Sequence, residues 1–389
     1  MLFTYSSIYH ECIWREVHKF AYQYLSYIIK EVSVYSPSVT CTMPSVSPLP
    51  VEVVDLFCGI GGLSYGLSLA GLDVVSGYDL DKTCAYAYES NTGAKFFYQD
   101  IAKLEADEVL RQYSTEGIRI LAGCAPCQPF SSYAFKYDLL YEFGRIIKEV
   151  KPHIVTMENV PQIAAFREKD VLGDFVDLLE SQGYRVSVSV VYCPDYGIPQ
   201  TRKRLVLLAS RFGDIALLPP TNKPEEYVTT ADVIGKLPAL MAGEADPSDP
   251  LHRAKALSPL NQERMRLTPY GGSWKDWPKE LQLECHKKAS GQTFGSVYGR
   301  MRWEKPAPTM TTQCTGWGNG RFGHPEQNRA ITPREAALIQ TFPASYRFFV
   351  NEDAVPITTA SRYIGNAVPP RLGEVIGMSI VNHLKEINL

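Results

Sequence analysis

The feature that most constrains the fold of this chain is an apolar strand that ends in a glycine-rich turn and continues as a helix. Residues 51–57 form a compact apolar stretch, the turn Cys58-Gly59-Ile60-Gly61-Gly62 follows, and a helical pattern runs to Ala70. Glycines let the backbone approach a ligand closely, and a helix N-terminus offers free N–H groups. The segment therefore predicts a cofactor-binding loop.

A carboxylate stands at an informative distance from this loop. The next predicted strand, residues 73–78, leads into Asp79, which lies twenty residues after Gly59. An acidic residue at this spacing commonly accepts hydrogen bonds from ribose hydroxyls. The two features together predict a nucleoside cofactor, but they do not say which one.

Strand and helix patterns then alternate as far as residue 209. Further strands are predicted at 95–98, 118–122, 153–157, 184–192 and 205–209, and helices at 81–91, 138–150 and 170–181. This alternation predicts a doubly wound α/β sheet. The rhythm stops at about residue 210 and resumes with a helix near 333–340. We expect an N-terminal extension and linker (1–50), a catalytic domain (51–209), a smaller irregular domain (210–329) and a C-terminal return to the catalytic domain (330–389).

The composition of the chain excludes several classes of protein. Of its 389 residues, 45% are hydrophobic and 21% charged, which is typical of a soluble globular protein. We expect no membrane span, because no run of about 18 apolar residues occurs. The nine scattered cysteines suit a reducing cytosol. Cys124 and Cys127 have metal-like spacing but no second pair, so no metal site is expected.

The net charge of −3 does not indicate a nucleic-acid partner, but the charge distribution is uneven. Residues 252–305 carry eleven Lys and Arg against five Asp and Glu, a local excess of six positive charges. Such a stretch can bind phosphates, or it can be an ordinary solvated surface.

A cysteine in a proline-flanked turn is the strongest candidate for chemistry. The segment 123–132 contains Cys127 and directly follows a predicted buried strand. Open α/β sheets hold their ligands at this end of a strand, where the pKa of a partly exposed thiol can be tuned. The spacing alone also allows Cys127 to be a small core residue.

Six short motifs follow one another along the chain: DLFCGIGG, PCQPFS, ENV, QTRKR, REAALIQTFP and GNAVPP. In this order they resemble those of the cytosine-C5 DNA methyltransferases of bacterial restriction–modification type. The resemblance covers about 51–209 and 330–389. It implies a Rossmann-like methyltransferase sheet with a target-recognition domain at 210–329. It also implies S-adenosylmethionine as the cofactor, with S-adenosylhomocysteine as the product.

The resemblance implies a division of labour among four catalytic residues. Cys127 would add to C6 of cytosine, which turns C5 into a nucleophile for the methyl group. Glu158, as a carboxylic acid at N3 of the cytosine, would offset the negative charge that builds on the ring. Arg204 would hold O2 of the cytosine, and Arg202 would steady the catalytic loop. None of these groups can reach a stacked base, so the cytosine must be flipped out of the duplex.

The same resemblance implies two sets of binding residues. The cofactor set is Phe57, Gly59, Gly61, Gly62, Asp79, Asp100, Pro126, Asn366 and Val368. The DNA set is Gln128, Ser131, Arg300, Arg302 and Thr309.

The chain departs from the family pattern at residues 133–137. Family members usually have a longer, polar loop here that closes over DNA. Either this lid is short, or the printed chain lacks a segment; we prefer the second explanation, since mobile loops are the kind that such omissions affect.

Two alternatives to a DNA methyltransferase stay open. One is a tRNA cytosine-C5 methyltransferase, and the other is a DNA-binding module that has lost catalysis through a short lid. For the main hypothesis we expect double-stranded DNA and a cognate restriction endonuclease as partners. We also expect no membrane association, a monomer, and a cytoplasmic, nucleoid-associated location in a bacterium.

Overall fold

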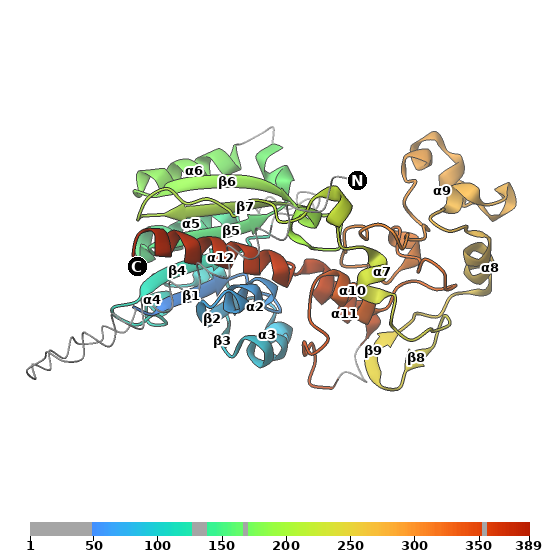
Figure 1. Cartoon of the computed structure of the whole chain (residues 1–389), viewed down its shortest axis with the longest axis horizontal. Coiled ribbons are helices and arrows are strands. Elements are labelled where there is room, and N and C mark those ends of the chain that lie inside the picture. The colour runs from blue at the N-terminus through green and yellow to red at the C-terminus, as the bar shows by residue number, and fades with distance from the viewer. Residues whose placement is uncertain (1–48, 127–137, 166–169, 352–355) are drawn as a thin grey trace, which may run out of the picture. The chain divides into compact units, whose positions relative to one another are not determined.

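Seven strands form the sheet on which the rest of the fold is built (Figure 1). The structure is a computed structural model that describes residues 49–126, 138–165, 170–351 and 356–389. The strands are β1 (Val51–Leu56), β2 (Asp73–Asp79), β3 (Lys95–Tyr98), β4 (Ile118–Gly123), β5 (Ile154–Asn159), β6 (Arg185–Tyr192) and β7 (Lys203–Ser210). All seven were predicted from the sequence, within two residues at each end.

The strand order is β3-β2-β1-β4-β5-β7-β6. The first five strands are parallel, and β7 runs antiparallel to both β5 and β6. This confirms the doubly wound α/β class; the reversed direction of β7 was not predicted. Its consequence is functional, because Asn159 at the end of β5 pairs with Leu205 near the start of β7. The first residues of β7 therefore lie at the same edge as the carboxyl ends of the parallel strands.

Both faces of the sheet are buried, because successive strand residues alternate between two apolar cores. Val53 packs into one core and Val54 into the other, and Ile120 and Leu121 divide in the same way. The first core is closed by α2 (Gly62–Leu69) and α12 (Pro370–Glu386), and α3 (Ala85–Thr92) also contributes to it. The second core is closed by α4 (Ala106–Leu110), α5 (Asp138–Val150) and α6 (Val171–Ser181).

Glycines let the C-terminal segment pack directly against α2. A Cβ atom on Gly62 would lie 2.2 Å from the carbonyl oxygen of Val368, and one on Gly66 would lie 2.2 Å from that of Pro370. No side chain fits at such distances. The glycine turn and the GNAVPP motif, about three hundred residues apart in the chain, are thus in backbone contact.

The irregular stretch contains short elements and its own small core. Its elements are α7 (Thr230–Ile234), β8 (Ala245–Asp246), β9 (Asp249–Arg253), α8 (Pro259–Leu267) and α9 (Glu284–Lys287). Met265, Trp274, Trp277 and Trp317 form the core. The helices α10 (Pro333–Ile339) and α11 (Ile357–Asn366) follow, and α11 was not predicted. Contacts group Leu49–Leu389 into one compact unit, so the domain limits at 209/210 and 329/330 stay predictions.

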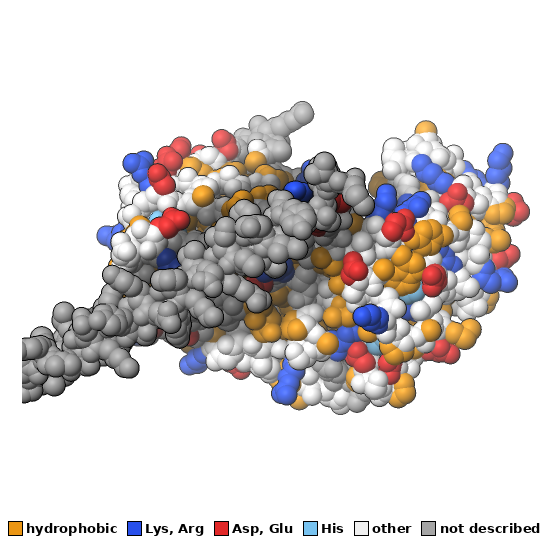
Figure 2. All heavy atoms as spheres, viewed as in Figure 1, with side chains coloured by type: hydrophobic (Ala, Val, Ile, Leu, Met, Phe, Trp, Pro, Cys, Tyr) orange, Lys and Arg blue, Asp and Glu red, His pale blue; other side chains and the backbone are white. Residues whose placement is uncertain are grey.

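The surface of the irregular stretch carries charges of both signs. Figure 2 shows Lys and Arg side chains scattered among acidic and apolar ones over the lobe that carries α8 and α9. On this face the local basic excess does not form a continuous patch. None of the described helices is both long and apolar enough to span a bilayer.

Candidate active site

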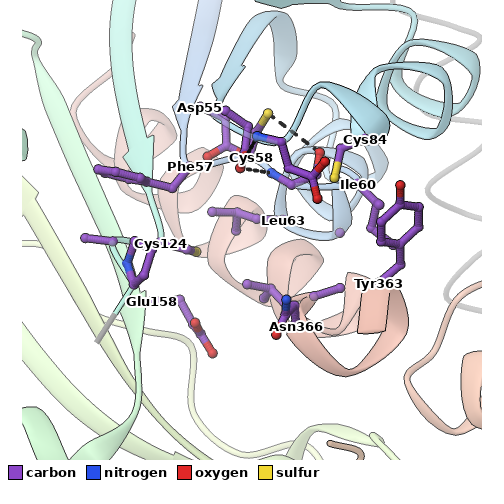
Figure 3. Close-up of a pocket in the computed structure, with 18 of the residues that line it drawn as sticks. Asp55, Phe57, Cys58, Ile60, Leu63, Cys84, Cys124, Glu158, Tyr363 and Asn366 are labelled. Carbon is purple, nitrogen blue, oxygen red and sulfur yellow. Dashed lines mark hydrogen bonds between the residues drawn. The ribbon is translucent and has the colours of Figure 1, made fainter. Parts of the chain in front are cut away.

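A cavity of about 500 Å³ lies at the carboxyl edge of the sheet (Figure 3). Its size suits a small-molecule ligand. Strand ends that are distant in sequence share its wall with the end of α11. The wall includes Asp55, Phe57, Cys58, Gly59, Gly62, Asp79, Asp100, Cys124, Pro126, Glu158, Arg202, Arg204, Arg362, Asn366 and Val368. The structure thus brings together most of the residues that the sequence indicated for cofactor binding and catalysis.

The turn between β1 and α2 bends sharply around one side of the cavity. Gly59 and Gly61 have φ angles of +52° and +89°, which L side chains rarely adopt. Phe57 also has a positive φ, of +62°, although it is not a glycine. Such unfavourable backbone conformations concentrate at functional sites. Gly61 precedes the first residue of α2 and provides no side-chain cap for its N–H groups.

Asp79, the last residue of β2, holds this turn in place. The Gly59 N–H donates to Asp79 Oδ2 at 2.8 Å, and the Asp81 N–H donates to Asp79 Oδ1, also at 2.8 Å. Burial raises the pKa of Asp79, whereas these N–H groups favour its ionised form and oppose that rise. The Asp79 carboxylate, which we predict to bind the cofactor, is therefore oriented before any ligand binds.

An ion pair extends this arrangement to α11. Arg362 Nη1 lies 2.7 Å from Asp81 Oδ2, and the Tyr363 hydroxyl donates to the Thr83 carbonyl oxygen at 2.9 Å. Arg362 therefore reaches the glycine turn through Asp81 and Asp79. The sequence gave no signal for Arg362, because its partner lies 281 positions away.

Asp100, Asn366 and Val368, which were also predicted to bind the cofactor, line the same cavity. Asp100 Oδ1 accepts a hydrogen bond of 3.1 Å from the Ala102 N–H, which fixes the carboxylate at the end of β3. Asn366 is exposed, and Val368 is buried with its carbonyl oxygen above Gly62.

Glu158 and Arg204 form an ion pair on the opposite wall. Arg204 Nε lies 2.6 Å from Glu158 Oε1, and only 7% of Glu158 is exposed. The pair exists because β7 is antiparallel: Glu158 near the end of β5 pairs with Val206, two residues after Arg204. The pair is largely shielded from water, and the contact brings the two charges together although Oε1 accepts no hydrogen bond within the described residues.

Arg202 joins the cavity wall to the segment 307–310. Its Nη1 donates to the Met310 carbonyl oxygen at 3.0 Å, and the Gln200 side chain accepts from the Met310 N–H at 2.7 Å. The Thr309 hydroxyl donates to the Thr201 carbonyl oxygen at 3.0 Å. Burial and the neighbouring Arg204 charge lower the pKa of Arg202 to about 10. Thr309 therefore lies next to the part of the cavity wall that Arg202 forms.

Asn159 was not assigned a role from the sequence, although it belongs to the ENV motif. Its Nδ2 donates to the Ala125 carbonyl oxygen at 3.1 Å, and its Oδ1 accepts from the Val160 N–H at 2.8 Å. It ties the end of β5 to the turn after β4. Desolvated surroundings and the neighbouring Glu158 raise the pKa of the Cys124 thiol in this turn well above its usual range.

Three predicted residues, Cys127, Gln128 and Ser131, lie outside the described residues. Pro126, the residue directly before Cys127 in the chain, lines the cavity. Residues 133–137 also lie outside the described residues. It therefore stays open whether the lid loop is short or the printed chain lacks a segment.

Arg300 does not have the placement expected of a DNA-contacting residue. It is 4% exposed, and its guanidinium donates five hydrogen bonds to other parts of the irregular stretch. The acceptors are the carbonyl oxygens of Met265, Thr268, His324 and Gln327 and the side chain of Asn328. A buried guanidinium with these partners is not free to contact a phosphate, so we revise its predicted role to an internal one.

Arg302, two residues later, has the opposite environment. Its side chain is 46% exposed, lies over the Tyr270 ring at 5.7 Å and is 3.7 Å from Glu304. The geometry leaves it accessible to a ligand from solvent.

Comparisons with known proteins agree with this geometry. Residues 51–382 match the model of the C-5 cytosine-specific DNA methylases. The chain is 51% identical over 342 residues to the Type II methylase M.HgiDII of Herpetosiphon aurantiacus, covering 86% of this chain and 96% of that protein. It is 29% identical to the Type II methyltransferase M1.HphI of Haemophilus parahaemolyticus, covering 86% and 87%. Among solved structures, DNMT2 of Spodoptera frugiperda has the same fold, with a TM-score of 0.59, 16% identity and coverage of 85% and 99%.

Proposed function

Since the chain belongs to the C-5 cytosine-specific DNA methylases and is therefore an S-adenosylmethionine-dependent enzyme that methylates cytosine in DNA, we propose how its residues divide the work. The observation that carries the proposal is the single cavity. It joins the glycine turn and Asp79 on one side to Glu158, Arg202 and Arg204 on the other. Such a cavity can hold a cofactor and an extruded base next to each other.

Cys127 is the nucleophile of this proposal. Its thiolate adds to C6 of the cytosine, and the C4–C5–C6 electrons of the ring become an enamine whose C5 takes the methyl group. The C5 proton then passes to solvent water, and the returning electrons expel the thiolate from C6. Pro126 lines the cavity immediately before Cys127, which supports this assignment.

Glu158 and Arg204 stabilise the ring while the thiolate is attached. As the base binds and Arg204 turns to O2, Glu158 takes up a proton from solvent and donates it to N3, which offsets the developing negative charge. Their 2.6 Å ion pair holds the two groups next to each other at the cavity wall before the base arrives. Arg202 and Asn159 act as positioning residues, because each holds backbone of an adjoining segment.

The residues present fit S-adenosylmethionine. Gly59 and Gly62 line the cavity, no atom from elsewhere in the described chain lies within 4 Å of where a Cβ atom on Gly59 would stand, and Asp79 is an oriented carboxylate that we assign to the ribose. Phe57, Gly59, Asp100, Asn366 and Val368 line the same space, with Gly61 shaping the turn. When bound, the cofactor supplies an electrophilic methyl group on a sulfonium.

The substrate we propose is a short specific sequence in double-stranded DNA, with the target cytosine flipped out. The Type II methylases among the relatives support a restriction–modification role, with a cognate endonuclease that acts on the same site. Arg302 and Thr309 contact the DNA, as do Gln128 and Ser131. We further propose that the protein is a monomer that works in the bacterial cytoplasm, associated with the nucleoid.

Bisulfite sequencing of DNA from cells that express the protein tests this proposal and returns the recognised sequence. We expect one cytosine of a short motif to be methylated throughout the genome, and no methylation with Cys127→Ser. Methylation confined to tRNA would favour the RNA enzyme, and binding of duplex DNA without methylation would favour the inactive binding module.

A further inference from the structure

Arg302 has a built setting that a general contact with DNA does not explain. The central carbon of its guanidinium lies 5.7 Å from the centre of the Tyr270 ring. Gly271, the next residue after Tyr270, has a φ angle of +65°, and a Cβ atom on it would lie 2.5 Å from the same carbon. Only a glycine leaves room for the guanidinium at this turn.

Two other arginines hold the turn on which Arg302 rests. Arg321 Nη1 donates to the carbonyl oxygens of Gly271 and Gly272, at 2.7 Å and 2.9 Å. The backbone N–H of Arg300 donates to the Gly272 carbonyl oxygen at 3.0 Å. The surface under the Arg302 guanidinium is therefore fixed from below.

Glu304 fixes the guanidinium from the side. Its Oε1 lies 3.7 Å from Arg302 Nη1, and its Oε2 accepts a hydrogen bond from the Tyr270 hydroxyl. The Tyr270 hydroxyl oxygen itself accepts from the Trp303 N–H at 2.7 Å. The hydrogen bond from Tyr270 lowers the pKa of Glu304, so the carboxylate stays ionised at neutral pH. A ring, a turn and an anion thus orient the guanidinium before a ligand arrives.

The hydrogen-bonding capacity of this oriented group is unused. Within the described residues the Arg302 guanidinium donates no hydrogen bond, and the side chain is 46% exposed. Arg300, two residues earlier, spends the same group on five internal acceptors. A rigid planar donor group that is open to solvent suits a ligand with two acceptors side by side.

Double-stranded DNA offers two partners of that kind, a phosphate group and the O6/N7 edge of guanine. Glu304 discriminates between them. An ionised carboxylate 3.7 Å from the guanidinium repels a phosphate that approaches the same group, whereas the edge of a base carries no net charge. The arrangement therefore favours a base over the backbone.

The course of the chain limits how far Arg302 can be from the target cytosine. Ala307 pairs with Gln200, and Arg202, two residues after Gln200, lines the cavity. Arg302 precedes Ala307 by five residues, so their Cα atoms are at most about 18 Å apart. Successive base pairs are about 3.4 Å apart, so this distance spans about five base pairs.

We propose that Arg302 recognises a guanine of the target sequence through O6 and N7 in the major groove, with Tyr270 and Glu304 as positioning residues. This inference rests on the proposed function, because it takes the chain to methylate a specific duplex sequence with Arg302 at the DNA interface. It adds that the recognised sequence contains a guanine within about five base pairs of the methylated cytosine.

Substitution of single atoms in the DNA tests the inference. The sequence found by bisulfite sequencing is made as short duplexes in which 7-deazaguanine replaces one guanine at a time, which removes N7 and keeps base pairing. Methyl transfer from radiolabelled S-adenosylmethionine gives kcat/KM for each duplex. At the guanine that Arg302 recognises, we expect the wild type to lose about 5- to 20-fold.

Arg302→Ala should lower kcat/KM on the unmodified duplex about 10- to 100-fold, and 7-deazaguanine at that one position should then cause no further loss. Arg302→Lys should also be insensitive there, because an ammonium lacks the planar pair of donors. Tyr270→Phe keeps the ring and removes the hydroxyl that holds Glu304, so we expect about a two- to fivefold loss and a weaker response at the same guanine. Thermal unfolding verifies that the three variants fold.

Arg266→Ala is the matched control. Arg266 is an exposed arginine on α8 in the same stretch, so its removal takes away the same charge without touching the Tyr270 turn. The response of this variant to 7-deazaguanine should equal that of the wild type at every position.

The inference is overturned if Arg302→Ala keeps the wild-type response to 7-deazaguanine at every guanine, or if the recognised sequence has no guanine near the target. Equal weakening on every duplex, together with a smaller salt dependence, would make Arg302 a phosphate contact and would also overturn it. If the wild type methylates no DNA, the proposed function itself fails, which is a different result.

Discussion

Arg204, at the start of β7, and Arg300, in the irregular stretch, are both largely buried, but they serve different partners. Arg204 faces the Glu158 carboxylate in the cavity, whereas Arg300 donates mainly to backbone carbonyl oxygens. In the sheet, strand pairing already satisfies the backbone. The irregular stretch lacks that pairing, and the five donors of a guanidinium can replace it. Arg204 is therefore available to the cavity, whereas Arg300 is used to hold irregular backbone together.

The largest expected effect lies on the sheet side of this comparison. Glu158→Gln removes the acid that supports the activated ring while keeping the shape of the side chain. We expect kcat for DNA methylation to fall about 10³- to 10⁴-fold. Methyl transfer from radiolabelled cofactor measures the rate, and thermal unfolding should change little. A loss of under tenfold would remove Glu158 from the chemistry.

Arg300→Ala tests the irregular side. It leaves four carbonyl oxygens and an asparagine side chain without their donor, so we expect a loss of about 3 kcal/mol or more in the free energy of unfolding. Urea unfolding measures this loss. Arg300→Lys should recover only part of it, because an ammonium cannot reproduce the planar set of five bonds. A variant as stable as the wild type would show that these bonds do not support the fold.

Arg302→Ala is the counterpart of that change, two residues away. Because the side chain is exposed, we expect stability within about 0.5 kcal/mol of the wild type. DNA binding should weaken, and the slope of log affinity against log salt should decrease by about one if Arg302 contacts a phosphate. Fluorescence anisotropy over a range of salt concentrations measures both. Unchanged affinity and slope would place the DNA interface elsewhere.

Arg362→Ala should have the smallest effect. Its ion pair with Asp81 is partly exposed, and such pairs contribute about 0.2–1 kcal/mol. Because Asp81 also contacts Asp79, we expect an affinity for S-adenosylmethionine about two- to fivefold weaker, with kcat unchanged. A double-mutant cycle with Asp81→Asn isolates the coupling. Additive effects of the two changes would contradict the connection through Asp81.

The sequence was most informative where structure is local. The strands between residues 51 and 210 follow from periodicity, as do the helices there except α4, which was not predicted. The glycine turn with Asp79 follows from spacing. The reversed direction of β7 could not be predicted this way, although it is what brings Arg204 to Glu158. Arg362 was missed and Arg300 misplaced because their partners are set by packing between segments that are distant in the sequence.

The account depends most on covalent attack by Cys127 beside Glu158. Duplex DNA containing 5-fluorocytosine at the target position tests it directly, because fluorine at C5 cannot leave as a proton does and the enzyme stays attached. With S-adenosylmethionine present, we predict a protein–DNA adduct that survives denaturation and whose mass includes the methyl group, with the cross-linked peptide containing Cys127. No adduct, or one on another cysteine such as Cys124, would contradict the account.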